Sequence, residues 1–194
     1  MMYWFCKFLA KFLLKCFFGF KQTGLENIPK KGGFILASNH VSHMDPIVLS
    51  AACPRMINFM AKKELFTGFL FSRWLFSLRA FPVNRNAADI GAIREAFRRV
   101  KAGQGLLLFP EGRRNEGDSI GKPEEGVGFL AAKLKVPVVP AYVQGTKDAL
   151  PKGSTALKFS KVSVRFGKQI IIEGDMPYQE IAGMIMVNIK NISC

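Results

Sequence analysis

The chain has 194 residues, a length typical of one domain with a substantial core, and 49% of them are hydrophobic. Its 28 lysines and arginines against 14 acidic residues predict an anionic partner, such as a phospholipid surface, a phosphorylated substrate, an acidic carrier protein or a nucleic acid. The 18 phenylalanines favour lipid, and the four cysteines, without a C-x-x-C pair, argue against a disulfide framework or a cysteine metal site.

Residues 1–21 are predicted to form a helix that lies in a membrane surface. Aromatic and aliphatic side chains cover most of this segment, whereas Lys7, Lys11 and Lys15 recur every four residues and form one basic stripe. A spanning helix needs about 20 mostly uncharged residues, and a signal peptide has its charges before the apolar core. An interfacial helix with its lysines toward anionic headgroups fits best. The alternative is a helix packed on the protein's own core, with the lysines in solvent.

After Gly24 the chain alternates between expected strands and helices. The expected strands are residues 33–37, 56–61, 80–83, 105–109, 136–143, 162–166 and 170–172. The expected helices are residues 47–53, 64–78, 86–102, 126–135 and 178–190. Asn86 is the expected cap of the third helix, whose core stripe would be Ile90, Ile93, Phe97 and Val100. This order predicts one α/β domain, residues 22–194, with a mostly parallel central sheet flanked by helices.

The stretch Ser38–Pro46, SNHVSHMDP, contains both histidines of the chain and an aspartate after them. Pro46 suits the start of a helix, so Asp45 is the expected helix N-cap. A turn between strand and helix can fold His40 back toward Asp45, so that the carboxylate holds one ring nitrogen and the other faces a substrate. A plain aspartate cap beside two surface histidines is the alternative. A metal site would lack a third protein ligand.

Four motifs together resemble one known family. Asn39-His40-x-x-x-x-Asp45 resembles the first motif of the 1-acyl-glycerol-3-phosphate acyltransferase family, within the glycerolipid acyltransferases. The later stretches FPVNR, FPEGR and VPVVP, which begin at residues 81, 109 and 136, resemble its second, third and fourth motifs in the same order. The resemblance covers roughly residues 25–145.

This resemblance implies roles for the histidine and the aspartate. His40 would be the general base that takes the proton from an acceptor hydroxyl, and Asp45 would orient and stabilise its imidazole. The acceptor oxygen would attack an acyl thioester directly. The sequence itself also favours direct attack, because it has neither a G-x-S-x-G elbow nor a cysteine beside a histidine. His43 has no role in the family's pattern and is expected to lie in the turn.

The resemblance also implies an acceptor-binding group. Arg85 and Arg113 are candidates for the acceptor's phosphate, because a guanidinium can donate two parallel hydrogen bonds to it. Glu111 and Gly112 follow a buried strand, where open α/β sheets build sites, and Glu111 is expected to fix Arg113 or the acceptor's glycerol. Arg113 occupies the slot of a small hydroxyl residue in the family and Arg114 the usual basic slot, so either arginine can be the phosphate ligand.

Two further positions depart from the family's pattern. Asn84 stands where the family often has aspartate, and the PEEG stretch at residues 123–126 places acids where the family often has lysine. The second change can alter the preference for the acyl donor or the acceptor.

The resemblance as a whole implies an O-acyltransferase of phospholipid biosynthesis. It would move a fatty acyl chain from acyl-carrier protein or coenzyme A to the sn-2 hydroxyl of lysophosphatidic acid, giving phosphatidic acid, with no metal and no bound cofactor. We expect a peripheral or monotopic protein at the cytoplasmic face of the cell membrane, in contact with phospholipid. The alternatives are another lysophospholipid or glycerol-3-phosphate as acceptor, or a non-catalytic membrane-surface protein. Nucleic acid is not an expected partner, because the aromatic residues lie in apolar helices.

Overall fold

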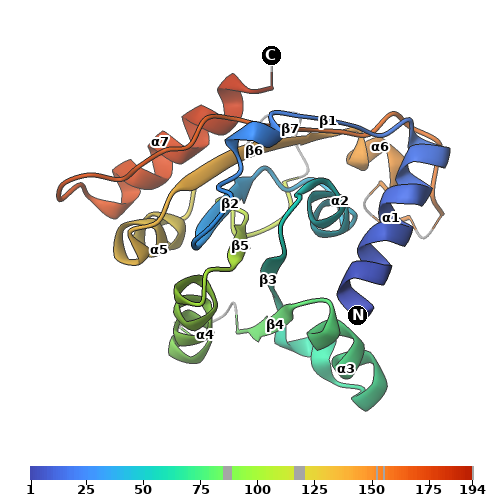
Figure 1. Ribbon diagram of the computed structural model, residues 1–194, viewed down its shortest axis with the longest axis horizontal. Helices are drawn as coiled ribbons and strands as arrows, with labels where there is room; N and C mark the ends of the chain where they lie inside the picture. Colours follow the sequence, from blue (N-terminus) through green and yellow to red (C-terminus); the bar gives the residue numbers. More distant parts are fainter. Residues whose placement is uncertain (85–88, 116–120, 152, 155, 194) are drawn as a thin grey trace.

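A seven-stranded sheet forms the centre of the computed structural model, which describes residues 1–84, 89–115, 121–151, 153–154 and 156–193 (Figure 1). The strands are β1 (Lys21–Thr23), β2 (Phe34–Ser38), β3 (Ile57–Lys62), β4 (Ala80–Val83), β5 (Gly105–Leu108), β6 (Val138–Gln144) and β7 (Ser163–Phe166). The helices are α1 (Met2–Phe18), η1 (Leu25–Asn27), α2 (Asp45–Ala52), η2 (Lys63–Phe66), α3 (Phe69–Ser77), α4 (Ile90–Lys101), α5 (Glu125–Leu134), α6 (Thr146–Ala149) and α7 (Tyr178–Asn191).

The sheet is mostly parallel, as the sequence predicted. Its strand order is β1-β7-β6-β2-β5-β3-β4, and among these neighbours β6 and β7 are the antiparallel pair. Every residue of β2 and β5 is buried. Continuous apolar runs such as FILA and GLLL suit these central positions, because helices cover both faces of a parallel sheet.

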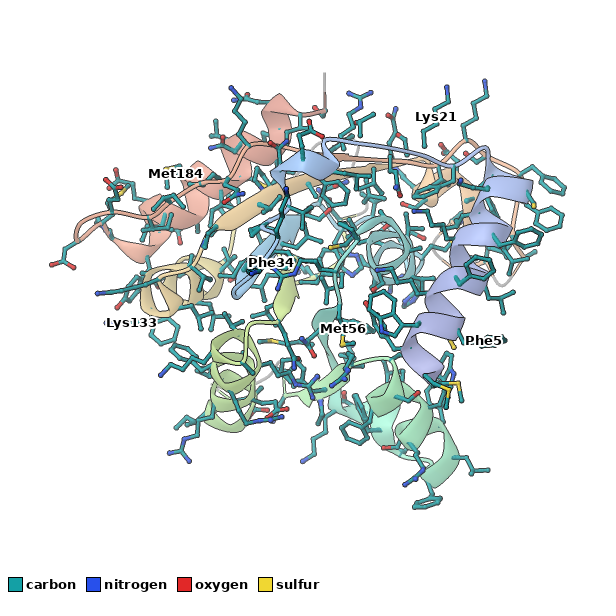
Figure 2. The ribbon with its side chains drawn as sticks, in the orientation of Figure 1. Phe5, Lys21, Phe34, Met56, Lys133 and Met184 are labelled. Carbon is teal, nitrogen blue, oxygen red and sulfur yellow. The ribbon has the colours of Figure 1, made fainter. Side chains whose placement is uncertain are left out.

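Two hydrophobic cores lie on opposite faces of the sheet. Phe34 and Leu36 of β2 point to the face covered by α1 and α2, whereas Ile35 and Ala37 point to the face covered by α4, α5 and α7. Phe34 is completely buried at the centre of the molecule, and Phe5 of α1 lies at its edge (Figure 2). The expected single α/β domain with flanking helices is confirmed.

Helix α1 packs on the protein through a side that includes Lys7. The Tyr3 hydroxyl accepts a hydrogen bond from the backbone N–H of Ile57 (3.1 Å). The Lys7 ammonium donates to the carbonyls of Cys53 and Arg55, just past the end of α2, and lies 4.8 Å from the ring centre of Trp4. Burial lowers the pKa of Lys7. The prediction that this lysine faces headgroups or solvent is therefore wrong.

The opposite side of α1 is apolar and exposed. Its exposed residues include Phe5, Phe8, Phe12 and Phe17. The helix thus packs on the protein's own core, as the alternative prediction had it, while its aromatic rings face outward and, of its three lysines, Lys15 is exposed. Among the described residues, no helix combines the length and apolar composition needed to cross a membrane.

Three expected elements differ from the structure. The predicted helix at residues 64–78 is divided into η2 and α3, because Gly68 adopts an extended backbone between them. The predicted strand at residues 170–172 is a single bridge between Ile170 and Val138. The Asn86 cap lies outside the described residues, and α4 begins at Ile90 with Asp89 accepting from the Ala92 N–H (2.9 Å).

The predicted core stripe of α4 is partly wrong. Ile90 is 62% exposed, whereas Ala92, Ala96 and Val100 form the buried side. These small side chains allow the helix to lie close to the sheet, and Phe97 packs at the border of that core.

Candidate active site

The turn between β2 and α2 brings His40 and Asp45 into contact. The His40 Nδ1 atom lies 2.8 Å from the Asp45 Oδ2 atom, and both side chains are buried. The turn therefore folds the histidine back onto the aspartate, as the sequence predicted. Because Nδ1 is held by the carboxylate, Nε2 is the ring nitrogen that can act on a substrate.

The Asp45 carboxylate is satisfied on both oxygens although it is completely buried. Its Oδ2 atom also accepts from the backbone N–H groups of Val41 and Ser42, both at 2.7 Å. Its Oδ1 atom accepts from the Thr146 hydroxyl at 2.6 Å. These donors offset the cost of removing a charged carboxylate from water.

The predicted N-cap role of Asp45 is wrong in its geometry. Asp45 is the first residue of α2, and Met44 holds the cap position. The carboxylate turns back to the preceding residues and bonds the turn instead of the first N–H groups of its own helix. A negative charge at this position still interacts favourably with the helix dipole.

Asn39 fixes the end of β2 to β6. Its amide nitrogen donates to the Val143 carbonyl (2.9 Å), and its amide oxygen accepts from the Val143 N–H (2.8 Å). The amide thus continues the hydrogen bonding of the sheet one residue past the end of β2. Asn39 and Thr146 are positioning residues whose roles were not predicted from the sequence. The signal for Asn39 was its place directly before His40, whereas Thr146 lies 101 residues from its partner.

The loop after β5 forms the other wall of the site. The Phe109 ring stacks on the His40 ring, with centroids 3.9 Å apart and planes inclined by 16°. The Asn115 N–H donates to the His40 carbonyl (2.8 Å). The two loops meet because β2 and β5 are parallel neighbours, and loops that follow such strands lie at the same edge of the sheet.

Glu111 braces this wall through backbone groups. Its two carboxylate oxygens accept from the N–H groups of His40 (3.3 Å) and Gly121 (3.2 Å). In the described structure this carboxylate therefore holds backbone rather than the Arg113 guanidinium, which corrects one of its two expected roles. Gly112 has a φ of 65°, a conformation that favours glycine, and a Cβ there would lie 3.0 Å from the Glu124 side chain.

A polar cavity of about 440 Å³ opens beside the dyad formed by His40 and Asp45. It is lined by Glu111, Arg113, Arg114, Asn115, Gly121, Lys122 and Glu124. The structure thus brings the predicted Arg113 and Arg114 together at one cavity whose wall bonds to the His40 backbone. The third predicted arginine, Arg85, lies outside the described residues.

The positive charge of Arg114, which lines this cavity, affects the pKa of His43. Partial burial lowers the pKa of His43, and the positive Arg114 side chain and His40 lower it further. His43 is exposed, and its ring has a smaller tendency to carry a proton than an ordinary histidine. The described residues contain no group of three His, Cys, Asp or Glu side chains that could hold a metal ion.

An apolar cavity of about 260 Å³ lies between α1, α2 and α3. It is lined by Tyr3, Cys6, Lys7, Leu9, Ala10, Leu13, Pro46, Ile47, Ser50, Phe59, Trp74 and Leu78. Pro46 and Ile47 directly follow Asp45, so this cavity begins at the helix that carries the dyad's carboxylate. Another cavity, of about 470 Å³, lies between α5 and residues 171–178 and shares no lining residue with the dyad or its two neighbouring cavities.

Comparisons with known proteins agree with one another. Residues 19–144 match the family described as Acyltransferase. The chain is 34% identical to the 1-acyl-sn-glycerol-3-phosphate acyltransferase of Bacillus subtilis, over 80% of this chain and 79% of that protein. It is 31% identical to the protein of the same name from Streptococcus pneumoniae, over 76% of this chain but only 54% of that protein.

The fold also matches a solved structure. The crystal structure of the 1-acyl-sn-glycerophosphate (LPA) acyltransferase PlsC from Thermotoga maritima superimposes with a TM-score of 0.81 at 24% identity. The match covers 97% of this chain and 77% of that one. At this level of identity, the likeness establishes the fold.

The proximity of Arg114 to His43 can be measured by NMR. We expect the ring of His43 to titrate below the ordinary histidine value of about 6.5. Arg114→Ala removes a positive charge that disfavours the imidazolium, so the pKa of His43 should rise in this variant. Arg113→Ala is the matched control and should change this pKa much less. An unchanged pKa of His43 in Arg114→Ala would contradict the proximity of these two side chains.

Proposed function

This chain belongs to the acyltransferase family and is an O-acyltransferase, and we propose that it acylates the sn-2 hydroxyl of 1-acyl-glycerol-3-phosphate, giving phosphatidic acid. One observation carries this proposal. A histidine held by a buried carboxylate lies beside a cavity that contains two arginines, so that a base and phosphate-binding cations share one site. The names of the bacterial relatives support the same acceptor.

The proposed reaction uses His40 as the general base. Its Nε2 atom takes the proton of the acceptor hydroxyl while the oxygen attacks the thioester carbonyl. Asp45 stabilises the imidazolium that forms and holds Nδ1 in place. When the tetrahedral intermediate collapses, the carbon–sulfur bond breaks and the leaving thiolate receives the proton from His40. One ester bond forms and one thiol is released, without a covalent acyl-enzyme.

The polar cavity is proposed to bind the acceptor's phosphate. Arg113 is exposed and Arg114 is partly buried at the cavity, where a guanidinium can donate two parallel hydrogen bonds to a phosphate, and Lys122 adds a third positive charge. Arg85 stays a candidate ligand. Glu111 contributes by fixing the backbone of His40 relative to this cavity.

Glu124 brings a negative charge into the same cavity. It belongs to the PEEG stretch, where the family often has lysine. An acid at this position favours a positively charged or hydroxyl-bearing group over additional phosphate. Acceptors with such headgroups therefore belong in a test of specificity alongside lysophosphatidic acid.

The apolar cavity between α1, α2 and α3 is proposed to take a fatty acyl chain. Its walls are almost entirely apolar, and it begins next to Asp45. Burying an acyl chain there stabilises binding by about 0.8 kcal/mol per methylene group. The donor is proposed to be a thioester of acyl-carrier protein or coenzyme A, with no metal or bound cofactor.

The protein is proposed to work at the cytoplasmic face of the membrane, where phospholipid synthesis would use its product. The outward side of α1 is aromatic, and α3, on the same side of the molecule, exposes Phe69 (79%), Leu70 (80%) and Trp74 (43%) (Figure 1). A patch of this kind on a protein surface marks an interaction site. The proposed acceptor is a membrane amphiphile, so a protein seated on the bilayer can receive it without its transfer through water.

Acyl transfer by the purified protein tests the reaction. With lysophosphatidic acid, other lysophospholipids and glycerol-3-phosphate as acceptors, we expect lysophosphatidic acid to be acylated fastest with at least one thioester donor. His40→Ala should lower the rate by about 10²- to 10⁴-fold, because the general base is lost. His43→Ala is the matched control and should cost less than about tenfold. Full activity of His40→Ala would refute the mechanism.

Vesicle binding tests the membrane surface on α1. The double variant Phe8→Ser/Phe12→Ser removes two exposed rings and should bind phosphatidylglycerol vesicles at least about tenfold more weakly in co-sedimentation. Val187→Ser changes an apolar residue on α7 that is as exposed as Phe12, and this variant should bind like the unchanged protein. Equal binding by all three proteins would rule out this role of α1.

A further inference from the structure

We propose that residues 156–161 form an additional lipid-contacting element that extends the membrane surface of α1 and α3 to the loop before β7. The inference rests on the proposed membrane association and adds a segment that neither the motifs nor the two helices include. The sequence of the segment is ALKFSK. Its side chains suit an anionic bilayer, with apolar groups for the acyl boundary and lysines for the headgroups.

The apolar side chains of this segment are unusually exposed. Leu157 is 61% exposed, and Phe159 is 84% exposed, more than Phe69 on α3. Single exposed apolar residues are common on soluble proteins. Here two of them lie two residues apart and alternate with Lys158, so the segment presents a small apolar tip bordered by positive charge.

The segment is continuous with the outward side of α1. The rings of Phe159 and Phe17 lie 6.3 Å apart, and Phe17 is itself half exposed. In Figure 1 the chain between α6 and β7 runs beside the C-terminal part of α1. A bilayer that covers the aromatic rings of α1 would therefore also reach Phe159.

Backbone hydrogen bonds hold the segment in this position at both ends. The Lys158 N–H donates to the Ala149 carbonyl at the end of α6 (2.8 Å). The Val162 N–H donates to the Phe18 carbonyl at the end of α1 (2.9 Å), and the Val162 carbonyl accepts from the Lys21 N–H (3.1 Å). The exposed Leu157 and Phe159 side chains are thus presented from a backbone that is hydrogen-bonded to α1 and α6.

The charges near the segment favour anionic lipid. The exposed lysines here are Lys15 in the last turn of α1, Lys21 in β1, and Lys158 and Lys161 in the segment itself. No acidic residue occurs in the sequence between Asp148 and Glu173. Each lysine near an anionic bilayer surface strengthens binding by roughly fivefold.

The segment is also connected to the dyad through α6. Thr146, at the start of α6, donates to the Asp45 carboxylate, and the Leu150 carbonyl, just past its end, accepts from the Ser42 hydroxyl (3.1 Å). The same short stretch of chain therefore closes the catalytic turn and carries the anchor of residues 156–161. Contact of this segment with lipid would hold the chain that bonds the dyad's turn close to the bilayer, at the C-terminal end of α1, whereas α3 lies near its N-terminal half.

The test is vesicle co-sedimentation of the full chain with Leu157→Ser/Phe159→Ser. We expect roughly tenfold weaker binding to phosphatidylglycerol vesicles, because two apolar side chains that would contact lipid are lost. The melting temperature should stay unchanged, because both side chains are exposed and contribute little to the packing of the fold. Ile171→Ser is the matched control: Ile171 is 57% exposed but lies beside α5, and its replacement should leave binding unchanged.

A charge variant tests the choice of an anionic surface. Lys158→Gln/Lys161→Gln should weaken binding to phosphatidylglycerol vesicles more than tenfold and leave the weaker binding to phosphatidylcholine vesicles unchanged. Equal binding of both double variants and the unchanged protein would overturn the inference. The inference would also be overturned if these variants bound vesicles normally but lost affinity for acyl-carrier protein, because the segment would then be a protein-docking loop.

The outcomes separate this inference from the proposed membrane association. If Phe8→Ser/Phe12→Ser loses vesicle binding while Leu157→Ser/Phe159→Ser retains it, α1 binds lipid and residues 156–161 do not. If the unchanged protein itself fails to bind phosphatidylglycerol vesicles, the membrane association and the inference are both wrong.

Discussion

The buried carboxylate of Asp45 is the group on which the arrangement of the site depends. A fully buried negative charge is strongly unfavourable unless hydrogen-bond donors surround it, and here four donors do so. Val41 and Ser42 supply backbone N–H groups, His40 supplies a ring nitrogen, and Thr146 supplies a hydroxyl from α6. One carboxylate thus fixes the shape of the turn, the direction of the histidine and the position of a distant helix.

Helix α1 and the arginine-lined cavity are joined to the His40–Asp45 dyad through short elements. Asp45 begins α2, and the carbonyls just past the other end of that helix accept from Lys7 of α1. A helix of two turns therefore joins the dyad to the helix with the aromatic outer side. On the other side of the turn, Glu111 and Phe109 bring the arginine-lined cavity against His40. The base, the proposed phosphate ligands and the proposed lipid surface are linked within a small region.

Local contacts could be predicted from the sequence, and contacts between distant segments could not. The meeting of His40 and Asp45 follows from a five-residue turn, and the central strands follow from their apolar runs. Periodicity also located the lysine stripe of α1, but it does not indicate which side of a helix packs. Lys7 faces inward because its long side chain reaches the carbonyls beyond α2. The contact between Thr146 and Asp45 depends on the order of strands in the sheet, which no local pattern specifies.

The tautomer of His40 decides whether its Nε2 atom can act as the base. An ionised Asp45 that already accepts two backbone N–H groups can bond to His40 only if Nδ1 carries the proton, which leaves Nε2 free to accept one. Nitrogen NMR of the labelled ring, at a pH where the imidazole is neutral, distinguishes the two forms. We expect a protonated Nδ1 and an unprotonated Nε2 in the unchanged protein. A proton on Nε2 with Nδ1 unprotonated would contradict this expectation.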